Sequence, residues 1–452
     1  MRSEFALIPL DDLTDGTSIT YGVVKPGDEV KKGVAFVRGG DVLGGRVLVS
    51  QLRTISSEVS AQYARTLLRG GELLISLVGN PGEVAIAPPS LRGANIARQV
   101  GLIRIDPNKA DANYVQCFMR SKIGRDLLLA HSKGSVQQVI NLRDLKSIRV
   151  PLPSLAVQKE VSSLVQSFDD RIALLRETNA TLEAIAQALF KSWFVDFDPV
   201  RAKQQGLAPA GMNEATAALF PDSFEESALG LVPEGWSLTP FGQLLSHTIG
   251  GDWGADVPDE KNDTRVAIVR GTDIPDLKSG AVSRVPYRYT SSKKLATRKL
   301  EDGDIVLEVS GGSKDQPTGR AIYVGSGLLA MFDCAVEPAS FCRLLRPRSK
   351  EIGLLLGQHL AYIYDQGKTW EYQNQSTGIA NFQTTHFLET ELVAVPPQQV
   401  LTAFADVIRL LIQRVQLSQI RELAALRDTL LPRLISGQLR LPDAVSLIEE
   451  TT

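Results

Sequence analysis

Acidic residues that could hold a catalytic metal ion lie near the start of the chain. Asp11 and Asp12 precede the string Glu29-x-Lys31, and some metal-dependent nucleases use an acidic pair with a Glu-x-Lys string. Short strings of this kind are common, and this one lies in a segment rich in turn residues. The string GDIVLEVS, which begins at Gly303, has two acidic residues but no lysine after them. Solvated charges explain both segments better than a metal site does.

One short string resembles a phosphate-binding loop. QGKTW (366–370) contains Gly-Lys-Thr, but the glycine required five places before Gly367 is Tyr362, so the backbone cradle is missing. No G-x-G-x-x-G string follows an expected strand, and no metal-ligand spacing links the four histidines and three cysteines. These residues are His131, His247, His359, His386, Cys117, Cys334 and Cys342. We therefore expect no catalytic, metal or cofactor site in this chain.

Local clusters of basic residues suggest a different kind of site. The stretch 284–299 holds six basic residues, no acidic residue and two tyrosines. The stretch 38–69 holds five arginines against Asp41 and Glu58. Basic side chains mixed with Tyr, Ser, Thr and Gln suit contact with phosphates and hydrogen bonding to base edges. A single such stretch is usually a solvated strand face, but two in equivalent places favour nucleic acid.

The composition sets the class of protein. A length of 452 residues predicts roughly two to four domains. Hydrophobic residues make up 43% and charged residues 22%, as in a soluble globular protein. The net charge of −2 gives no global sign of a polyanionic partner. No secretory segment and no apolar run long enough for a bilayer are found, and the cysteines are few and odd in number, so we expect a cytoplasmic protein without disulfides.

The chain contains an internal repeat. FVRGGDV (36–42) and IVRGTDI (268–274) share an Arg-Gly-x-Asp turn at an offset of 232 positions. At the same offset LLRGGELLISLVGN (67–80) aligns with KLEDGDIVLEVSGG (299–312). Further matches follow in the same order while the offset drifts to about 245, which makes chance similarity a poor explanation. A unit this long is a duplicated multi-part module and not a solenoid repeat.

Each half has a strand-rich part followed by a long helical part. Short apolar runs bounded by glycines predict strands in both halves, with one helical stretch at 112–131 and another at 351–366. From 156 to 197 neither Pro nor Gly interrupts the chain, and apolar residues recur at alternating spacings of four and three. Asn179 occupies one position of this seam. The period of 3.5 predicts a coiled-coil helix; the alternative is an amphipathic helix lying on a globular core.

The second helical part has a less regular stripe. It runs from 399 to about 434, has the same length as the first, and is free of helix breakers until the string LLPRLISG (430–437). Since neither helix can bury its stripe alone, we expect the two to pack on each other. The predicted domains are a first head (1–152), a first helix (153–198), a spacer rich in Ala, Gly, Pro and Glu (199–232), a second head (233–395), and a second helix with the C-terminal tail (396–452).

Four strings in these positions resemble one known family. They are VPLPSLAVQKEV (150–161), LFKSWFVDFDP (189–199), LVPEGWSLTPFGQLL (231–245) and LAALRDTLLPRLISGQL (423–439). Together they are similar to the specificity subunit of type I restriction–modification enzymes over essentially the full length. Half one lacks the Pro-Glu-Gly-Trp opening and starts instead at FALIPLDDL (5–13), and AVPPQQV (394–400) is a shortened form of the motif that begins the helix.

The resemblance implies an α+β fold with pseudo-twofold duplication. Two target-recognition domains, joined by two conserved helices in an antiparallel coiled coil, would each read half of an asymmetric, split DNA site. The subunit itself would be non-catalytic. Methyl transfer from S-adenosylmethionine would belong to two modification subunits, and ATP- and Mg-dependent translocation and cleavage to restriction subunits. The resemblance therefore implies double-stranded DNA and these subunits as partners, with no cofactor on this chain.

The duplication also separates scaffold from base-reading candidates. Features that both heads share, such as Arg38 and Arg270, cannot distinguish two half-sites, so they suit turns or phosphate positioning. Base readers should lie where the halves differ, since long donors and amides suit guanine and adenine edges. The complete set of DNA-binding candidates is Arg38, Arg46, Gln51, Arg53, Gln62, Arg65, Arg98, Gln99, Gln137, Gln138, Arg270, Arg284, Arg288, Lys293, Lys294, Lys314, Gln316, Arg320, Gln373 and Gln375.

Apolar residues at the helix ends are expected to face outward and are candidates for docking the modification subunits. They are Phe190, Trp193, Phe194, Leu430, Leu431 and Leu434, and the alternative is that they close the protein's own core. A helix of about 33 residues is roughly 50 Å long, which matches about 15 base pairs, so the coiled coil would set the gap between half-sites. Two other classes of function remain: a scaffold with two protein-binding heads, and a stand-alone DNA-modifying enzyme.

Overall fold

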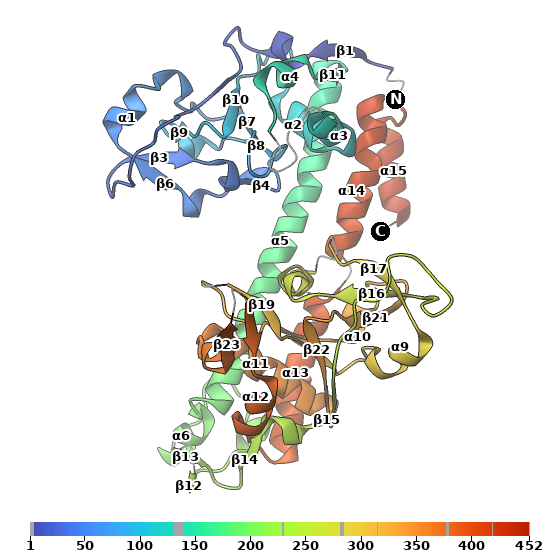
Figure 1. The fold of residues 1–452 in the computed structure, drawn as a ribbon. Coiled ribbons are helices and arrows are strands. Elements are labelled where there is room, and N and C mark those ends of the chain that lie inside the picture. The colour runs from blue at the N-terminus through green and yellow to red at the C-terminus, as the bar shows by residue number, and fades with distance from the viewer. Residues whose placement is uncertain are drawn as a thin grey trace. The chain divides into compact units, whose positions relative to one another are not determined.

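The computed structural model describes residues 4–130, 139–227, 230–280, 284–313, 315–376, 379–417 and 419–451 (Figure 1). The chain divides into two compact units. Unit 1 consists of Met1–Ile172 with Leu423–Thr452, and unit 2 consists of Ala173–Glu422. Unit 1 contains the first head and unit 2 contains the second, and each unit has hydrophobic cores of its own.

The strands of unit 1 form small sheets. Two have the strand orders β2-β10-β7-β8 and β6-β3-β9, and the remaining strands pair as β1-β11 and β4-β5. Their bounds are β1 Ala6–Pro9, β2 Thr20–Tyr21, β3 Val34–Val37, β4 Val42–Leu43, β5 Arg46–Val47, β6 Arg53–Ile55, β7 Leu73–Ser76, β8 Val84–Ile86, β9 Asn95–Ile96, β10 Val100–Ile103 and β11 Arg149–Leu152.

Unit 2 builds the corresponding sheets from later strands. They have the orders β15-β22-β18-β20 and β17-β16-β21, with the pair β14-β25, and unit 2 adds β19-β24-β23 and β12-β13. Their bounds are β12 Phe224–Ser227, β13 Gly230–Pro233, β14 Ser237–Pro240, β15 Leu245–Gly250, β16 Thr264–Val269, β17 Tyr287–Thr290, β18 Ile305–Glu308, β19 Ser310–Gly312, β20 Ala321–Tyr323, β21 Ala335–Pro338, β22 Cys342–Pro347, β23 Gln373–Ser376, β24 Ile379–Phe382 and β25 Leu392–Val395.

The two heads share one topology, which confirms the duplication. In each, the four-stranded sheet is antiparallel, and the middle strand of the three-stranded sheet pairs antiparallel with one neighbour and parallel with the other. The central strands β7 and β18 are buried on both faces, so their alternating side chains enter two cores. Leu73 and Ile75 lie in one core and Leu74 in another; Ile305 and Val306 divide in the same way.

The short helices flank these sheets. In unit 1 the single helical stretch expected at 112–131 is wrong, because two helices form there. Ser121 between them has an extended backbone, and its hydroxyl accepts a hydrogen bond from the amide of Gly124 at 3.2 Å, which starts the second helix. The unit 1 helices are α1 Ser57–Ala61, α2 Ala112–Arg120, α3 Lys122–Ala130, α4 Leu142–Ser147 and α15 Leu441–Thr451.

The helices of unit 2 include the one expected near 351–366, which is α11. They are α6 Asp198–Gln204, α7 Glu214–Ala218, α8 Ile274–Lys278, α9 Ser292–Arg298, α10 Ser326–Leu329, α11 Lys350–Asp365, α12 Thr384–Thr390 and α13 Gln398–Val415. α11 begins at an N-cap serine, Ser349, whose hydroxyl accepts a hydrogen bond from the amide of Ile352 at 3.2 Å.

The long uninterrupted helix predicted after the first head is α5, Leu155–Phe194, with 40 residues. Its residues up to Ile172 belong to unit 1, where they pack on α14, Gln419–Ser436. Its residues from Ala173 belong to unit 2, where they pack on α13. Within unit 2 the packing is antiparallel, because Asn179 Nδ2 donates to the carbonyl of Val415 at 3.2 Å, whereas Phe194 contacts Phe404 near the other end of α13.

The predicted seam of α5 is largely buried. Asn179 is 6% exposed, as expected for a seam position, while two of the predicted seam leucines are half-buried. The buried apolar members are Val161, Val165, Phe168, Ile172, Leu175 and Ala186, and the half-buried ones are Leu182 and Leu189. The 3.5-residue period therefore located the buried face of this helix correctly.

The second helical part is not one helix, as its sequence predicted, but two. α13 ends at Val415, and Gln416 follows as a buried cap residue. The side chain of Gln416 donates from Nε2 to the carbonyl of Tyr323 at 3.1 Å and accepts at Oε1 from the amide of Leu328 at 3.3 Å. These bonds tie the chain to unit 2 at the point where α13 stops, and no Pro or Gly marks the position.

The spacer between the halves is packed onto unit 2. It forms α6 and α7, and Val200 and Phe220 are buried in the same core as α5 and α13. The ring of Phe220 meets Trp193 of α5 edge-on, with centroids 4.9 Å apart. The weak periodicity of this segment gave no sign of these anchors, which are single aromatic and aliphatic residues.

Candidate nucleic-acid interface

The repeated Arg-Gly-x-Asp string forms the same closed turn in both heads. Arg38 donates from Nε and Nη2 to Asp41, both at 3.1 Å, and its backbone amide donates to the same carboxylate at 2.7 Å. Arg270 and Asp273 repeat these bonds at 2.9, 2.7 and 2.9 Å. The two carboxylates are buried, and the pairing holds the pKa of each arginine above its ordinary value. These bonds close the turn in both heads, and its role as scaffold or in phosphate positioning stays a prediction.

Both guanidinium groups keep an exposed edge. The side chain of Arg38 is 39% exposed and that of Arg270 is 34% exposed. The carboxylate binds two of the five N–H groups of each arginine, and those N–H groups that have no other protein partner remain for a phosphate or solvent. Arg270 uses Nη2 also to donate to the carbonyl of Arg284 at 2.6 Å, which ties the turn to the start of the basic stretch.

Most candidates of the first head lie at its surface. Arg46, on β5, forms an ion pair with Asp170 of α5 at 2.9 Å. Arg53, on β6, lies 3.5 Å from Glu29. The first pair is exposed and Arg53 is half-buried beside an exposed glutamate, so each pair contributes little to folding. The other exposed candidates of this head are Gln51, Gln62, Arg65, Arg98 and Gln99.

The candidates of the second head divide into exposed and internally bound groups. Lys293 is exposed on α9, and Arg284 is exposed before β17. Lys294 is bound to Asp252 at 2.9 Å. Arg288 lies over the ring of Trp253 at 4.6 Å from its centroid and pairs with Asp256. These two bound cations are engaged within the protein as it stands.

Three further candidates of the second head make internal contacts. Arg320 donates from both Nε and Nη2 to Glu308, whose side chain is 2% exposed, so this arginine neutralises a buried carboxylate. Gln373 accepts from the amide and hydroxyl of Thr318 at 2.9 and 3.2 Å. Gln316 donates to the hydroxyl of Tyr364 at 3.4 Å.

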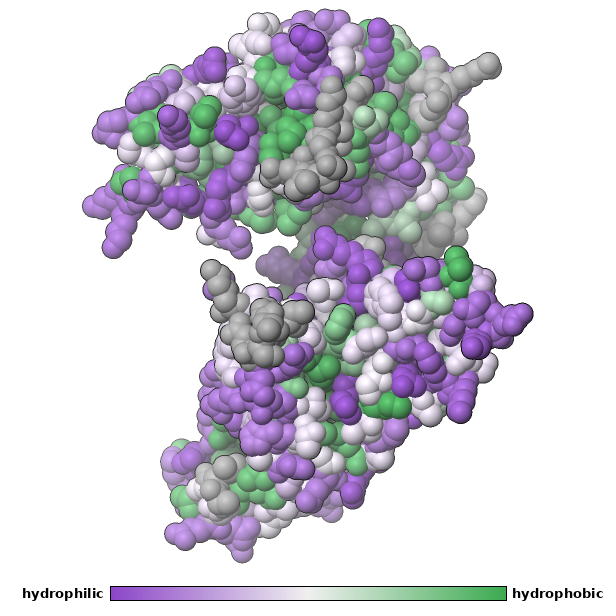
Figure 2. Space-filling view, in the orientation of Figure 1, coloured by the Kyte–Doolittle hydropathy of each residue, from purple (hydrophilic) through white to green (hydrophobic). Residues whose placement is uncertain are grey.

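Some candidates lie outside the described residues. These are Gln137, Gln138 and Lys314, and the side chain of Gln375 on β23 is likewise not described. Across the described parts, Figure 2 shows mainly hydrophilic side chains on the face in view, with exposed hydrophobic residues in small groups.

The candidate docking residues do not face outward, so that part of the expectation is wrong. All six are buried. Phe190, Trp193 and Phe194 lie in the core of unit 2, where Phe194 meets Phe404 at a centroid distance of 4.6 Å. The leucines Leu430, Leu431 and Leu434 lie in the core of unit 1. Their burial corresponds to the alternative, in which they close the protein's own core.

A buried charged cluster escaped the sequence analysis. Glu391 is 1% exposed and accepts from His359 Nε2 at 2.8 Å, from Lys368 and from the hydroxyl of Tyr372. Burial works against the charge of Glu391, but these partners outweigh it and lower its pKa to about 2. The members are 19 to 32 positions from Glu391 in the sequence, so no motif could reveal them. These hydrogen bonds join members of the cluster to one another, which suits a structural role.

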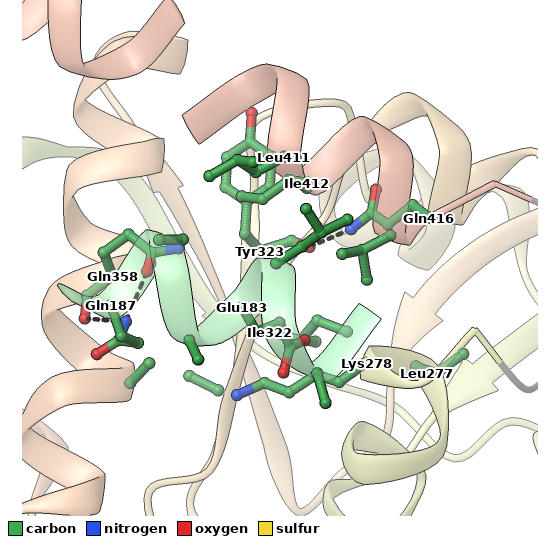
Figure 3. A pocket seen from close by; sticks show the side chains of 18 of the residues that line it. Glu183, Gln187, Leu277, Lys278, Ile322, Tyr323, Gln358, Leu411, Ile412 and Gln416 are labelled. Carbon is green, nitrogen blue, oxygen red and sulfur yellow. Dashed lines mark hydrogen bonds between the residues drawn. The ribbon is translucent and has the colours of Figure 1, made fainter. Parts of the chain in front are cut away.

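A cavity of about 470 Å³ lies in unit 2 between α5, α8, β20, α11 and α13 (Figure 3). Gln187 of α5 donates to the side-chain oxygen of Gln358 on α11 at 2.6 Å at one side of the cavity. Burial raises the pKa of Glu183, and the nearby Lys278 opposes this shift. The residues that line the cavity are mostly apolar, and they include no histidine, cysteine or serine that could act as a nucleophile or base.

Metal and membrane features are not found in the part of the chain that the structure describes. Its histidine, cysteine and acidic residues form no group of three or more that could hold a metal ion. The three cysteines are all free. No described helix combines the length and the apolar character that a bilayer crossing demands.

The fold and these surfaces define a class of protein: two copies of one strand-rich head, each attached to helices that pack in antiparallel pairs. Residues 23–184 match the family model described as the type I restriction modification DNA specificity domain. In this part the chain is similar to the specificity subunits of type I restriction–modification systems.

Individual relatives agree with this assignment. The chain is 32% identical to the EcoBI specificity subunit of Escherichia coli over 225 residues, which cover 47% of this chain and 46% of that protein, about half its length. It is 24% identical to the HindI specificity subunit of Haemophilus influenzae over 90% of this chain and 94% of that one. The crystal structure of the S subunit from M. genitalium has the same fold, with a TM-score of 0.51, 16% identity and 96% coverage of both chains.

Proposed function

We propose that this chain is the non-catalytic DNA-recognition subunit of a type I restriction–modification complex, in which each head reads one half of a bipartite, asymmetric duplex site. The observation that carries the proposal is the duplicated scaffold with different exposed side chains. Both heads share the closed Arg-Gly-x-Asp turn, whereas the side chains around it differ. Two similar frames with different surfaces are what two different half-sites require.

The shared and differing residues divide the work of recognition. Arg38 and Arg270 stand at the same place in both heads, and their exposed edges suit phosphate contact, which fixes orientation without reading sequence. Residues such as Gln99 in the first head and Lys293 in the second have no identical counterpart. Base reading is assigned to such positions, because amides and long cations match base edges in the major groove.

The partners and cofactors follow from this role. Two modification subunits would bind the chain and carry S-adenosylmethionine, and restriction subunits with ATP and Mg would complete a cleaving complex. The free cysteines and the polar surface support work in the cytoplasm, where the DNA is found. Since the six apolar helix-end residues are buried, the modification subunits must dock on other surfaces of the helices.

The helices would set the gap between the half-sites. Each helical residue adds 1.5 Å, and each base pair adds about 3.4 Å, so removal of four residues from α5 and four from its partner helix should shorten the preferred gap by about two base pairs. Methylation mapping of this variant, expressed with its partner subunits, measures the gap directly. The matched control keeps the helix length but replaces two exposed residues of α5, Arg171 and Glu177, by alanine.

The control should leave the gap unchanged, and an unchanged gap in the shortened variant would refute the ruler. Two other functions are tested in the same system. A scaffold with protein-binding heads would show no salt-dependent, sequence-selective binding to duplex DNA when assembled with its partners. A stand-alone enzyme would methylate or cleave DNA as the purified chain alone.

A further inference from the structure

One short turn has the same backbone hydrogen bonds in both heads but carries side chains of different chemistry. In the first head it spans 97–100, where the amide of Val100 donates to the carbonyl of Ala97 at 2.9 Å. In the second it spans 339–342, where the amide of Cys342 donates to the carbonyl of Ala339 at 2.8 Å. Each turn joins the parallel strand of the three-stranded sheet to the central antiparallel sheet.

The equivalence extends to the bonds that hold the turn in place. The carbonyl of Gln99 accepts from the amide of Leu77 at 2.7 Å, and the carbonyl of Phe341 accepts from the amide of Val309 at 2.9 Å. Leu77 and Val309 are separated by the repeat offset of 232 positions. Gln99 and Phe341 are therefore structural counterparts, each fixed to the central sheet through its backbone.

The side chains at these two positions are exposed but chemically different. Gln99 and its neighbour Arg98 are exposed in the first head, and both are among the candidates for base reading. Phe341 is 65% exposed, and its neighbour Ser340 is exposed as well. An amide next to a cation in one head is thus replaced by an aromatic ring next to a hydroxyl in the other.

The turn lies against the shared Arg-Gly-x-Asp turn in both heads. A Cβ atom on Gly39 would lie 3.4 Å from Cβ of Gln99. In the second head burial raises the pKa of the thiol of Cys342, the residue after Phe341, and the nearby backbone of Gly271 opposes this shift. Arg270 in turn contacts the start of the basic stretch 284–299. Phe341 is thus anchored next to the residues assigned to phosphate contact.

We infer that Phe341 is a base-contacting residue of the second head and packs on the 5-methyl group of a thymine in that head's half-site. This inference rests on the proposed function. In the major groove the thymine methyl is the apolar feature among the base edges, and a phenyl ring suits it, whereas Arg and Gln at the equivalent turn suit guanine and adenine. The same frame therefore presents a different base preference in each head.

The position of Phe341 argues against a structural role. Its backbone carbonyl accepts from the amides of Val309 and Ser310, where β18 gives way to β19, but most of its side chain is exposed to solvent, so packing gains little from the aromatic ring. A rigid turn also holds the ring without a large loss of conformational freedom on binding, which favours a contact residue. The neighbouring cations favour DNA as the partner that contacts this ring.

The test compares Phe341→Ala with the matched variant Gln99→Ala in the full chain assembled with its partner subunits. Methylation mapping of wild type first defines both half-sites. Each thymine of both half-sites is then replaced by deoxyuridine, which removes only the methyl group, and binding is measured by fluorescence anisotropy. For wild type, one replacement should weaken binding about fourfold, the value expected for one buried methyl group.

The same replacement should have no effect on Phe341→Ala, which should also accept cytosine at that position. Gln99→Ala should keep the deoxyuridine effect and relax the other half-site. Phe341→Leu, which keeps an apolar side chain, should retain part of the effect. If wild type is selective but Phe341→Ala responds to every replacement as wild type does, the inference is overturned and the proposed function stands. If wild type itself binds without selectivity, both fail.

Discussion

The two heads carry different polar side chains at equivalent buried positions of the backbone. Asn95 on β9 pairs with Phe36, and Glu337 on β21 pairs with Ile268, so the two stand at equivalent places in the parallel strand. Asn95 is completely buried; its side-chain oxygen accepts from Thr66 at 2.6 Å and its amide donates to Ser60. Glu337 is also completely buried, but its carboxylate has no hydrogen-bond partner among the described residues.

A second pair of positions shows the same contrast. Ser76 and Glu308 end the equivalent strands β7 and β18, and their amides donate to the carbonyls of Glu83 and Arg320 respectively, both at 2.8 Å. The first head thus has a hydroxyl where the second has a buried carboxylate, and an acid where the second has the arginine that pairs with it. Both positions of the pair differ in charge between the heads, and in the second head the charges of Glu308 and Arg320 neutralise each other.

The contrast extends to the base of each head. The amides of Leu10 and Phe241 donate at 2.8 Å to the carbonyls of Ile148 and Glu391 respectively. The first unit has an aliphatic side chain here, and the second has the charged cluster around Glu391. Backbone pairing therefore specifies the fold of both heads, whereas the buried polar groups differ between them. We expect the second unit to depend on ionisation far more than the first does.

The largest expected effect comes from removing Glu308. Glu308→Ala leaves Arg320 without its buried partner, and the loss of one member of a buried ion pair costs about 4 kcal/mol. The chain's four tryptophans all lie in unit 2, so urea denaturation followed by tryptophan fluorescence reports on that unit alone. A destabilisation of Glu308→Ala below about 1 kcal/mol would contradict the expected dependence of the second head on its buried ion pair.

The control for this prediction is Ser76→Ala at the equivalent place in the first head. Since Ser76 contributes a single long hydrogen bond of 3.4 Å to the carbonyl of Val78, its removal should cost well under 1 kcal/mol. Hydrogen exchange of the β7 peptide measures this loss. A cost equal to that of Glu308→Ala would show that the two positions are energetically alike.

The next largest effect is the loss of stability of unit 2 at low pH, which we attribute to Glu391. The pKa of Glu391 is lowered to about 2, so its stabilisation is present above the ordinary value near 4.5 and is lost as the pH falls towards 2. Glu391→Gln should therefore destabilise unit 2 by about 3 kcal/mol at pH 7 and should flatten the acid limb of its urea midpoint. The exposed Glu389→Gln is the matched control and should leave the acid limb as in wild type.

The smallest expected effect concerns Glu337, for which stability falls as the pH rises, the opposite of the pH dependence expected for Glu391. Burial, reinforced by the nearby Asp252, raises the pKa of Glu337 to about 7 despite Lys294 and Arg298. The folded state then holds the proton more tightly than the unfolded state, so stability falls as the pH rises from 4.5 through 7. Between pH 5 and pH 7 wild type should lose about 2 kcal/mol that Glu337→Gln does not lose. Parallel pH profiles of the two proteins in urea would contradict this.

The sequence predicted the repeat unit well because its signals are local. Arg, Gly and Asp at fixed spacing close one turn by themselves, and paired glycines such as Gly71 and Gly303 fit positions with φ of +93° and +110°. The seam of α5 was predictable for a similar reason, since helical periodicity places its buried residues in order along the chain. These features need no knowledge of distant contacts.

The features that were missed depend on distant contacts. The break after Val415 arises from bonds between Gln416 and the segment 323–328, and the spacer is anchored by Phe220 against Trp193. Several candidate readers turned out to have internal partners, as Arg320 has in Glu308. An isolated Arg, Gln or Phe carries no mark of whether it will be paired, buried or exposed.

The sequence by itself determined the duplication, the long helix and the resemblance to a known family, because each depends on residues that are near one another or repeated in order. Only the tertiary structure decided which charges are buried, which cations are already neutralised and which turn side chains remain exposed. The physical reason is that the cost of burying a polar group depends on partners supplied by remote segments. Gln99 and Phe341 became counterparts only when the strands around them were paired.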